Sequence, residues 1–268
     1  MKIIPCGLLA ALTGVLMAST PPTPISIPMS EATATPAAGI KNIVLVHGTW
    51  ADGSSWAKVI PLLQAKGYHV TAVQNPLTSL ADDVAATKRA IALQDGPVLL
   101  VGHSWGGVVI TEAGTDPKVS GLVYVAAAAP DAGQSFLELV QTATATPGND
   151  EIRPDAQGFV SMTPKGIMED FAQDLSKTEQ QVLIATQGPQ AFSALKEKVT
   201  VPAWKTKPSW YIVAANDRMI NPDLERTLAK KMNATTTTLP TSHVAMLAQP
   251  DKVAAVIMEA ASKTVAKN

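Results

Sequence analysis

The chain has 268 residues, of which 46% are hydrophobic and 16% are charged, and its net charge is −1. This length is enough to bury a full core, so we expect one globular unit with a modest insertion. The balanced charge excludes the basic footprint of a nucleic-acid-binding protein, and a small, roughly neutral molecule is the expected partner.

Residues 1–18 have the pattern of a secretory signal peptide. Lys2 supplies a positive charge, the run from Leu8 to Ala18 is almost entirely apolar, and polarity returns at Ser19. This order is typical of an export signal. An uncleaved anchor is the alternative, but the run is shorter than the roughly 20 residues of a membrane-spanning helix. We therefore expect a periplasmic or secreted protein with no stable membrane association after cleavage.

Residues 19–39 are rich in Pro, Thr, Ser and Ala. This composition cannot bury enough apolar surface to fold, so we expect a flexible leader before a folded domain over residues 40–268. Cleavage after Ala18 or near Ala34 fits the sequence. Cys6, the one cysteine, lies within the signal. For the mature protein we expect no disulfide, no metal and no cofactor.

From Lys41 onward, short apolar runs alternate with stretches that carry apolar residues at helical spacing. This alternation is typical of the α/β class, in which helices cover a parallel sheet. The expected strands cover residues 43–46, 70–73, 97–102, 121–127, 210–215 and 235–239. The expected helices cover residues 54–67, 105–114, 224–232 and 253–261, and another opens at Leu80 behind a capping box of Ser79 and Asp82.

Two features interrupt this regular pattern. Pro61 lies inside the expected helix over residues 54–67 and predicts a kink, and Ser54 is its expected cap. After Asp131 the alternation stops, and polar helical stretches follow, including one over residues 165–185. We interpret the segment at about 132–206 as a helical cap over the sheet.

The pentapeptide Gly102-His103-Ser104-Trp105-Gly106 follows an expected strand and opens an expected helix. Glycines on both sides of a serine allow a turn so tight that the hydroxyl projects from the carboxyl edge of the sheet. A glycine-rich turn of a nucleotide-binding protein is the alternative, but a dinucleotide fingerprint would follow the first strand. The placement therefore predicts that Ser104 is a nucleophile.

A serine hydroxyl needs a base to take its proton, and histidine suits this task near neutral pH. His47 ends the first strand, His69 lies in the second, and His103 occupies the variable position of the turn. His243 alone follows Ser104 in the chain, in the loop after the last expected strand. We therefore predict His243 as the base.

The imidazole of such a base is held by a carboxylate at the carboxyl end of a strand. Asp217 follows the strand over residues 210–215, and Asp131 follows the strand before it. Asp217 is the preferred acid because it follows the strong strand over residues 210–215, whereas Asp131 would require an acid displaced to the preceding strand. Asp131 stays open as the alternative, and its other role is to end a strand and begin the cap.

Attack on a carbonyl creates an oxyanion, which backbone amides stabilise. The amide of Trp105, directly after the nucleophile, is one expected donor, and that of Thr49, in the loop after the first strand, is the other. The substrate pocket is expected between these residues and the cap. Its predicted wall contains Trp50, Trp105, Met246, Met162, Met168 and Phe171.

Three motifs together resemble the α/β-hydrolase superfamily: Val-Leu-Val-His-Gly-Thr-Trp from Val44, Gly-His-Ser-Trp-Gly-Gly from Gly102, and Ser-His-Val-Ala-Met-Leu from Ser242. The resemblance extends from Lys41 to the end of the chain. The short entry strand, the single cap and the late acid are similar to the small esterases grouped with plant methyl-ester esterases and hydroxynitrile lyases.

This resemblance implies an α/β-hydrolase fold with about six mainly parallel strands, flanking helices and a helical cap. It also implies a triad of Ser104, Asp217 and His243, with Thr49 and Trp105 forming the oxyanion hole. The activity it implies is that of a serine esterase, which cleaves carboxylic esters or lactones of small molecules through an acyl-enzyme.

The resemblance leaves other activities to consider. Haloalkane dehalogenases and most epoxide hydrolases have aspartate where Ser104 stands. Hydroxynitrile lyases use a lysine close to the histidine, whereas none occurs between Leu239 and Pro250. Perhydrolases and acyltransferases share the triad and stay open. A small-molecule-binding protein with low turnover is the alternative of another class, because fold alone does not establish function.

Overall fold

The computed structural model describes residues 39–264. The expected signal peptide, and all of the expected leader except its last residue, lie outside the described residues. Within the described part, no helix is both long enough and apolar enough to cross a membrane.

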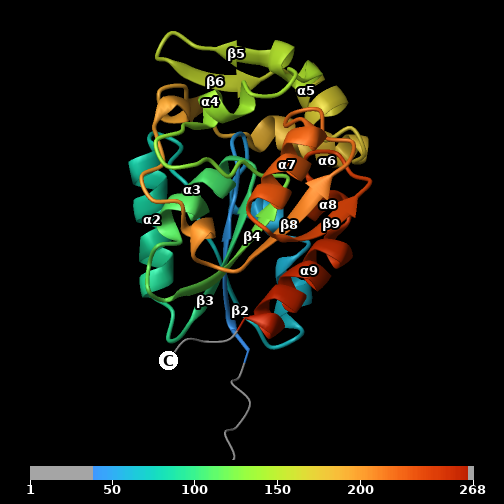
Figure 1. The fold of residues 1–268 in the computed structure, drawn as a ribbon. Coiled ribbons are helices and arrows are strands. Elements are labelled where there is room, and N and C mark those ends of the chain that lie inside the picture. Colours follow the sequence, from blue (N-terminus) through green and yellow to red (C-terminus); the bar gives the residue numbers. More distant parts are fainter. Residues whose placement is uncertain (1–38, 265–268) are drawn as a thin grey trace, which may run out of the picture. The chain divides into compact units, whose positions relative to one another are not determined.

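Six parallel strands form the central sheet in the order β2-β1-β3-β4-β8-β9 (Figure 1). This confirms the predicted α/β class and the predicted number of strands. The strands are β1 (Asn42–Val46), β2 (His69–Ala72), β3 (Val98–His103), β4 (Val119–Val125), β8 (Ser209–Ala214) and β9 (Thr235–Leu239). Every residue of β1, β3 and β8 is buried, because helices cover both faces of the sheet.

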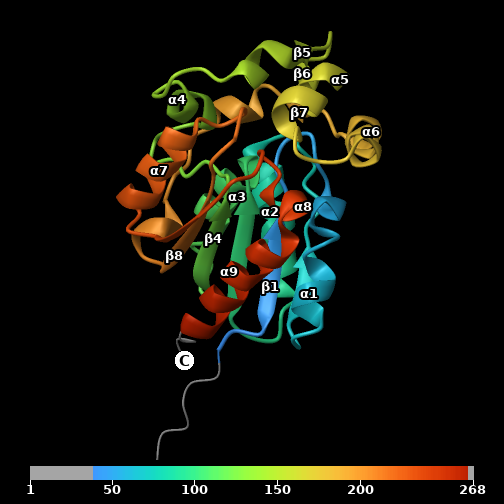
Figure 2. The same ribbon diagram turned by 90° about the vertical axis from the view of Figure 1, so that its right-hand side faces the viewer.

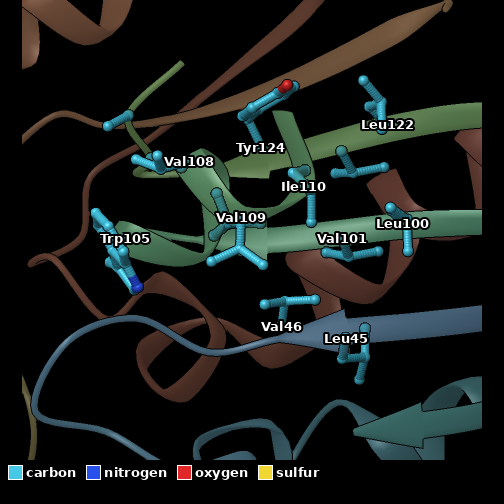
Figure 3. Close-up of a cluster of buried hydrophobic side chains, with 14 of the residues drawn as sticks. Leu45, Val46, Leu100, Val101, Trp105, Val108, Val109, Ile110, Leu122 and Tyr124 are labelled. Carbon is cyan, nitrogen blue, oxygen red and sulfur yellow. The ribbon is translucent and has the colours of Figure 1, made fainter. Parts of the chain in front are cut away.

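Helices cover the two faces of the sheet (Figure 2). On one face lie α1 (Ile60–Gln64) and α9 (Pro250–Lys263), and on the other α2 (Leu80–Ala92) and α3 (Trp105–Ala113). α7 (Pro222–Lys231) packs against β8, and the short α8 (Ala245–Ala248) packs against α9. Figure 3 shows apolar side chains of α3, such as Val109, beside those of β1 and β3.

The region of the first predicted helix differs from the prediction. A 3₁₀ turn, η1 (Gly53–Trp56), comes first, and Asp52 rather than Ser54 caps it, because its side chain accepts from the Ser54 amide over 2.6 Å. Pro61 does not kink a helix. It lies in the first turn of α1, where a missing N–H removes no helical hydrogen bond.

The expected cap segment lies at the carboxyl ends of the strands (Figure 1). Its helices are α4 (Phe136–Val140), α5 (Pro164–Gly166), a π-helical turn η3 (Ile167–Phe171) and α6 (Lys177–Thr186), so the predicted helix over residues 165–185 is interrupted. The 3₁₀ turns are η2 (Pro147–Glu151), η4 (Ala194–Lys196) and η5 (Ala203–Lys205).

A small antiparallel sheet within the cap was not predicted. It consists of β5 (Ile152–Pro154), β6 (Phe159–Met162) and β7 (Gln190–Ala191). Strands of two to four residues are too short to show a period of two in the sequence. The cap is therefore mixed rather than purely helical.

The first turn of α3 packs directly onto the backbone of the sheet. A Cβ atom on Gly106 would lie 2.4 Å from the carbonyl oxygen of Val46, and one on Gly102 would lie 2.5 Å from the oxygen of Gly106. Only glycine fits at such distances. The chain can therefore pass from β3 into α3 in a single residue, Ser104.

Candidate active site

Ser104 stands at the sharp turn between β3 and α3. Its φ of 54° and ψ of −120° are sparsely populated by residues other than glycine. The Ser104 amide donates to Val125 over 3.3 Å, and its carbonyl accepts from Gly107 and Ala128 over 3.0 and 3.2 Å. These hydrogen bonds hold a strained backbone of the kind found at nucleophile elbows.

His243 and Asp217 form a buried pair at the ends of β9 and β8. Nδ1 of His243 lies 2.6 Å from Oδ2 of Asp217, and both side chains are almost completely buried. Oδ1 of Asp217 accepts from the amides of Met219 and Ile220 over 2.6 and 3.0 Å. With its Nδ1–H directed at the carboxylate, the imidazole has Nε2 as its free basic nitrogen.

Asp131, the alternative acid, has a different environment. It lies near the protein surface, and its carboxylate pairs with Lys205 over 2.5 Å and with Lys231 over 2.9 Å. The hydrogen bonds from these two lysines hold the pKa of Asp131 well below its usual range. The structure thus brings Asp217, and not Asp131, to His243.

The predicted oxyanion hole combines two backbone segments. A Cβ atom on Gly48 would lie 2.6 Å from Cβ of Ser104, so the loop after β1 passes directly beside Ser104. Thr49 lines the same cavity as Ser104. Trp105 provides the first amide of α3, which no turn of the helix can satisfy. Both amides therefore belong to backbone next to the Ser104 hydroxyl.

Sequence reasoning did not single out Asp83, which holds Trp105 in place. The indole Nε1 of Trp105 donates to Oδ2 of Asp83 over 2.7 Å, and the amide of Leu77 donates to Oδ1 over 2.8 Å. Burial raises the pKa of Asp83 to about 6, although both hydrogen bonds act in the opposite direction. The sequence signal that could have identified Asp83 is its position on the apolar, buried side of the amphipathic helix α2.

Two further aromatic rings enclose His243. Nε2 of His103 lies 3.0 Å from the backbone oxygen of His243, and the two rings are 4.7 Å apart. Burial holds the pKa of His103 well below its usual range, so this ring is neutral and donates to the carbonyl through Nε2–H. The ring of Phe171 also contacts the imidazole of His243, and the two ring centroids are 5.3 Å apart. His243 is thus held through its backbone oxygen as well as through the carboxylate of Asp217.

A cavity extends from Ser104 and His243 towards the cap, and its other polar side chains belong to Thr49 and Asn149. None of the residues that line it is Asp, Glu, Lys or Arg. The remaining lining residues are Trp50, Phe136, Leu137, Val140, Ile152, Val160, Phe192, Leu195, Met219 and Ile220. The cavity therefore suits an uncharged, apolar ligand.

Of the residues predicted for the pocket wall, Trp50 lines this cavity, and its indole donates to Val160 in the cap over 3.0 Å. The other predicted residues do not line it. The end of the Met162 side chain packs against Gly166, and Met246 is buried where α8 meets α9. Phe171 contacts the rings of Trp50 and His243 instead.

Two predicted pocket residues in the elbow and cap have other surroundings. Trp105 directs its indole into the core towards Asp83. Met168 lies in η3 and does not line the cavity. α4, which sequence reasoning passed over, provides three lining residues, namely Phe136, Leu137 and Val140.

Comparisons with known proteins agree with this architecture. A sequence model of the Alpha/beta hydrolase family matches residues 43–256. A pyrethroid hydrolase of Sphingobium wenxiniae is 26% identical over 82% of this chain and 87% of its own. Methylesterase 8 of Arabidopsis thaliana is 26% identical over 69% of this chain and 76% of its own.

A solved structure shares the fold. The crystal structure of polyneuridine aldehyde esterase superimposes with a TM-score of 0.71 and 21% identity, over 82% of this chain and 98% of that chain. This likeness extends to the cap, because nearly all of that chain is matched.

Replacing Asp83 by Asn should change how stability depends on pH. Because the folded pKa is raised to about 6 from an ordinary value of 3.8, the folded wild type holds a proton that the unfolded chain loses in this interval. The wild type therefore loses stability relative to Asp83→Asn as pH rises. We expect the ratio of unfolding constants, wild type over Asp83→Asn, to increase about a hundredfold between about pH 4 and about pH 6. Above this interval the ratio should stay constant, as measured by urea unfolding.

Asp82→Asn is the matched control on the same helix. Hydroxyls of Ser79 and Thr78 donate to Asp82 and lower its pKa, so this exposed variant should show no such rise. A ratio for Asp83→Asn that does not change between these pH values would mean that Asp83 is already ionised in the folded protein.

Proposed function

Since the chain belongs to the alpha/beta hydrolase family, we propose that it is a serine esterase that cleaves small, uncharged carboxylic esters or lactones through an acyl-enzyme on Ser104. The observation that carries the proposal is the buried Asp217–His243 pair, whose His243 lines one cavity with the strained Ser104. This combination gives a serine hydroxyl both an exposed position and a base.

In the first half of the reaction, Nε2 of His243 takes the proton of the Ser104 hydroxyl while the oxygen attacks the ester carbonyl. The charge that forms on the imidazole is balanced by Asp217 over 2.6 Å. The amides of Thr49 and Trp105 stabilise the oxyanion, and in comparable enzymes one such donor contributes about 2.7 to 4 kcal/mol. When the intermediate collapses, the ester bond breaks and His243 gives its proton to the departing alcohol.

In the second half, a water molecule replaces the alcohol. His243 removes a proton from this water as it attacks the acyl-Ser104 carbonyl, and the same amides stabilise the second oxyanion. The carboxylic acid leaves, and Ser104 recovers its proton from His243. The chemistry needs no group beyond these side chains and water.

The cavity supports a particular class of ester. It offers no ion-pair partner to a charged substrate, and aromatic and aliphatic side chains form most of its wall, among them those from α4, η4 and the loop after β8. The relatives named for activity on esters, among them a methylesterase, agree with this class. We therefore expect neutral esters with apolar acyl or alcohol groups to be better substrates than charged ones.

Labelling with a fluorophosphonate, which reacts with activated serines, tests the nucleophile. We expect stoichiometric labelling of the wild type and none of Ser104→Ala, detected by mass spectrometry of the intact protein. In parallel, a panel of nitrophenyl esters and lactones should be cleaved by the wild type only. Labelling that persists in Ser104→Ala would move the nucleophile elsewhere, and an unlabelled wild type that binds its ligands would favour a binding protein.

Substitution of each candidate acid tests the choice between them. Asp217→Asn keeps the shape of the pair but favours the wrong tautomer of His243, so kcat should fall by about 10⁴-fold. Asp131→Asn, which disrupts only ion pairs near the surface with Lys205 and Lys231, should retain kcat within about threefold. The reverse order of effects on nitrophenyl ester hydrolysis would contradict the assignment.

We also propose that the protein is exported. The proposal rests on the charged start at Lys2 and the apolar run from Leu8 to Ala18. Expression in a bacterial host followed by fractionation and N-terminal sequencing should find a shortened chain outside the cytoplasm, beginning after Ala18 or near residue 34. A full-length chain found only in the cytoplasm would contradict it.

A further inference from the structure

Glu225 is a carboxyl group in the buried face of α7. Its side chain is completely buried, and Oε2 accepts from the amide of Ala214, at the end of β8, over 3.0 Å. Oε1 is also buried, and within residues 39–264 no N–H or O–H donates to it. An ionised carboxylate with a bare oxygen in such a place is strongly disfavoured.

The neighbouring side chain that can be the partner of Oε1 is that of Asp217. The amide of Asp217 donates to the carbonyl of Ala214 over 3.2 Å, and the amide of the same Ala214 donates to Glu225, so one residue at the end of β8 holds both acids. The charge of Asp217 and a hydrogen bond with its side chain are among the causes that raise the pKa of Glu225. Two buried carboxyl groups in contact cannot both be ionised, because no water screens their repulsion. One of the two therefore holds a proton.

The hydrogen-bond donors decide which acid is ionised. Asp217 accepts from three: the amides of Met219 and Ile220, and Nδ1 of His243. Glu225 accepts from one. Burial, followed by the charge of Asp217, holds the pKa of Glu225 well above its usual range. The proton therefore resides on Glu225.

The other titratable or charged groups around Glu225 do not change this assignment. Tyr211 faces it from β8, but burial raises the pKa of this phenol well above its usual range, and its hydroxyl is engaged by the backbone of Ala127. Arg226, the next residue on α7, directs its guanidinium to Asp223, with which it pairs over 2.6 Å.

We propose that Glu225 is a positioning residue of the triad, whose protonated carboxyl donates a hydrogen bond to Asp217 and extends the chain Ser104–His243–Asp217 by one member. This bond fixes the Asp217 carboxylate and spreads its charge. Asp217 then orients His243 but attracts the imidazole proton less strongly. The catalytic meaning of Glu225 rests on the proposed function, whereas its protonation can be measured without any substrate.

Glu225→Gln tests the protonation, because the amide oxygen can accept from Ala214 while its NH₂ donates to Asp217. The folded wild type keeps a proton that the unfolded chain releases, so the wild type should lose stability relative to the variant as pH rises. We expect the ratio of unfolding constants, wild type over Glu225→Gln, to increase about tenfold per pH unit between about pH 5 and about pH 7, as measured by urea unfolding.

Asp223→Asn is the matched control, since it removes an exposed carboxylate from the same helix. Its side chain is 89% exposed in the folded protein, so burial gives it no reason to hold a proton, and this variant should not show the rise expected for Glu225→Gln. A constant ratio for Glu225→Gln as well would overturn the proposal, whether or not the protein proves to be an esterase.

The positioning role is tested by the pH dependence of kcat/KM for an ester that the wild type cleaves. Glu225→Leu removes the donor, so Asp217 should attract the proton of His243 more strongly and move the acid limb upward by about one pH unit. Glu225→Gln should restore the wild-type limb. The role would be contradicted if the acid limb of kcat/KM did not move in Glu225→Leu, or if it moved downward in Glu225→Gln. If Glu225→Leu does not fold, the unfolding test and the pH profile of Glu225→Gln still decide.

Discussion

The turn from β3 into α3 is the constraint on which the rest of the site depends. Ser104 has a φ of 54°, and such strain costs on the order of 1–3 kcal/mol in a residue other than glycine. The close packing at Gly102 and Gly106 and the hydrogen bonds of the Ser104 backbone hold it there. The same turn places Ser104 at the cavity and starts α3 at the amide of Trp105, so the proposed nucleophile and one proposed oxyanion donor come from a single piece of backbone.

Around this turn, buried ionisable groups are kept neutral or are compensated. Asp217 is balanced by amides and by His243, and His103 is neutral because of burial. Asp83 and Glu225 have raised pKa values from the same cause. A dry surrounding strengthens each hydrogen bond in the site, and it makes an unpaired charge correspondingly costly. Under the proposal for Glu225, such a buried carboxyl group acts on His243 through Asp217 without contact with substrate.

The cap determines what can reach the triad. Trp50 links the loop after β1 to β6 through its hydrogen bond to Val160, so the oxyanion loop and the cap are joined at the cavity. Most of the cavity wall comes from short elements of the cap and from Met219 and Ile220, which lie two and three residues after Asp217 in the loop after β8. Changes in these elements would alter the choice of ester while leaving the sheet and the elbow as they are.

The sequence alone determined the alternation of strands and helices, the elbow at Ser104 and the candidate base His243, because these depend on backbone preferences of residues close in the chain. It left the acid open, since Asp131 and Asp217 both follow strands. Only the tertiary structure separated them, through the 2.6 Å contact of Asp217 with His243 and the ion pairs of Asp131 near the surface. The antiparallel sheet of the cap, the true cavity wall and the contact of Glu225 with Asp217 likewise required it. Contacts between side chains from distant segments depend on how the elements pack in three dimensions, and local sequence patterns do not contain that information.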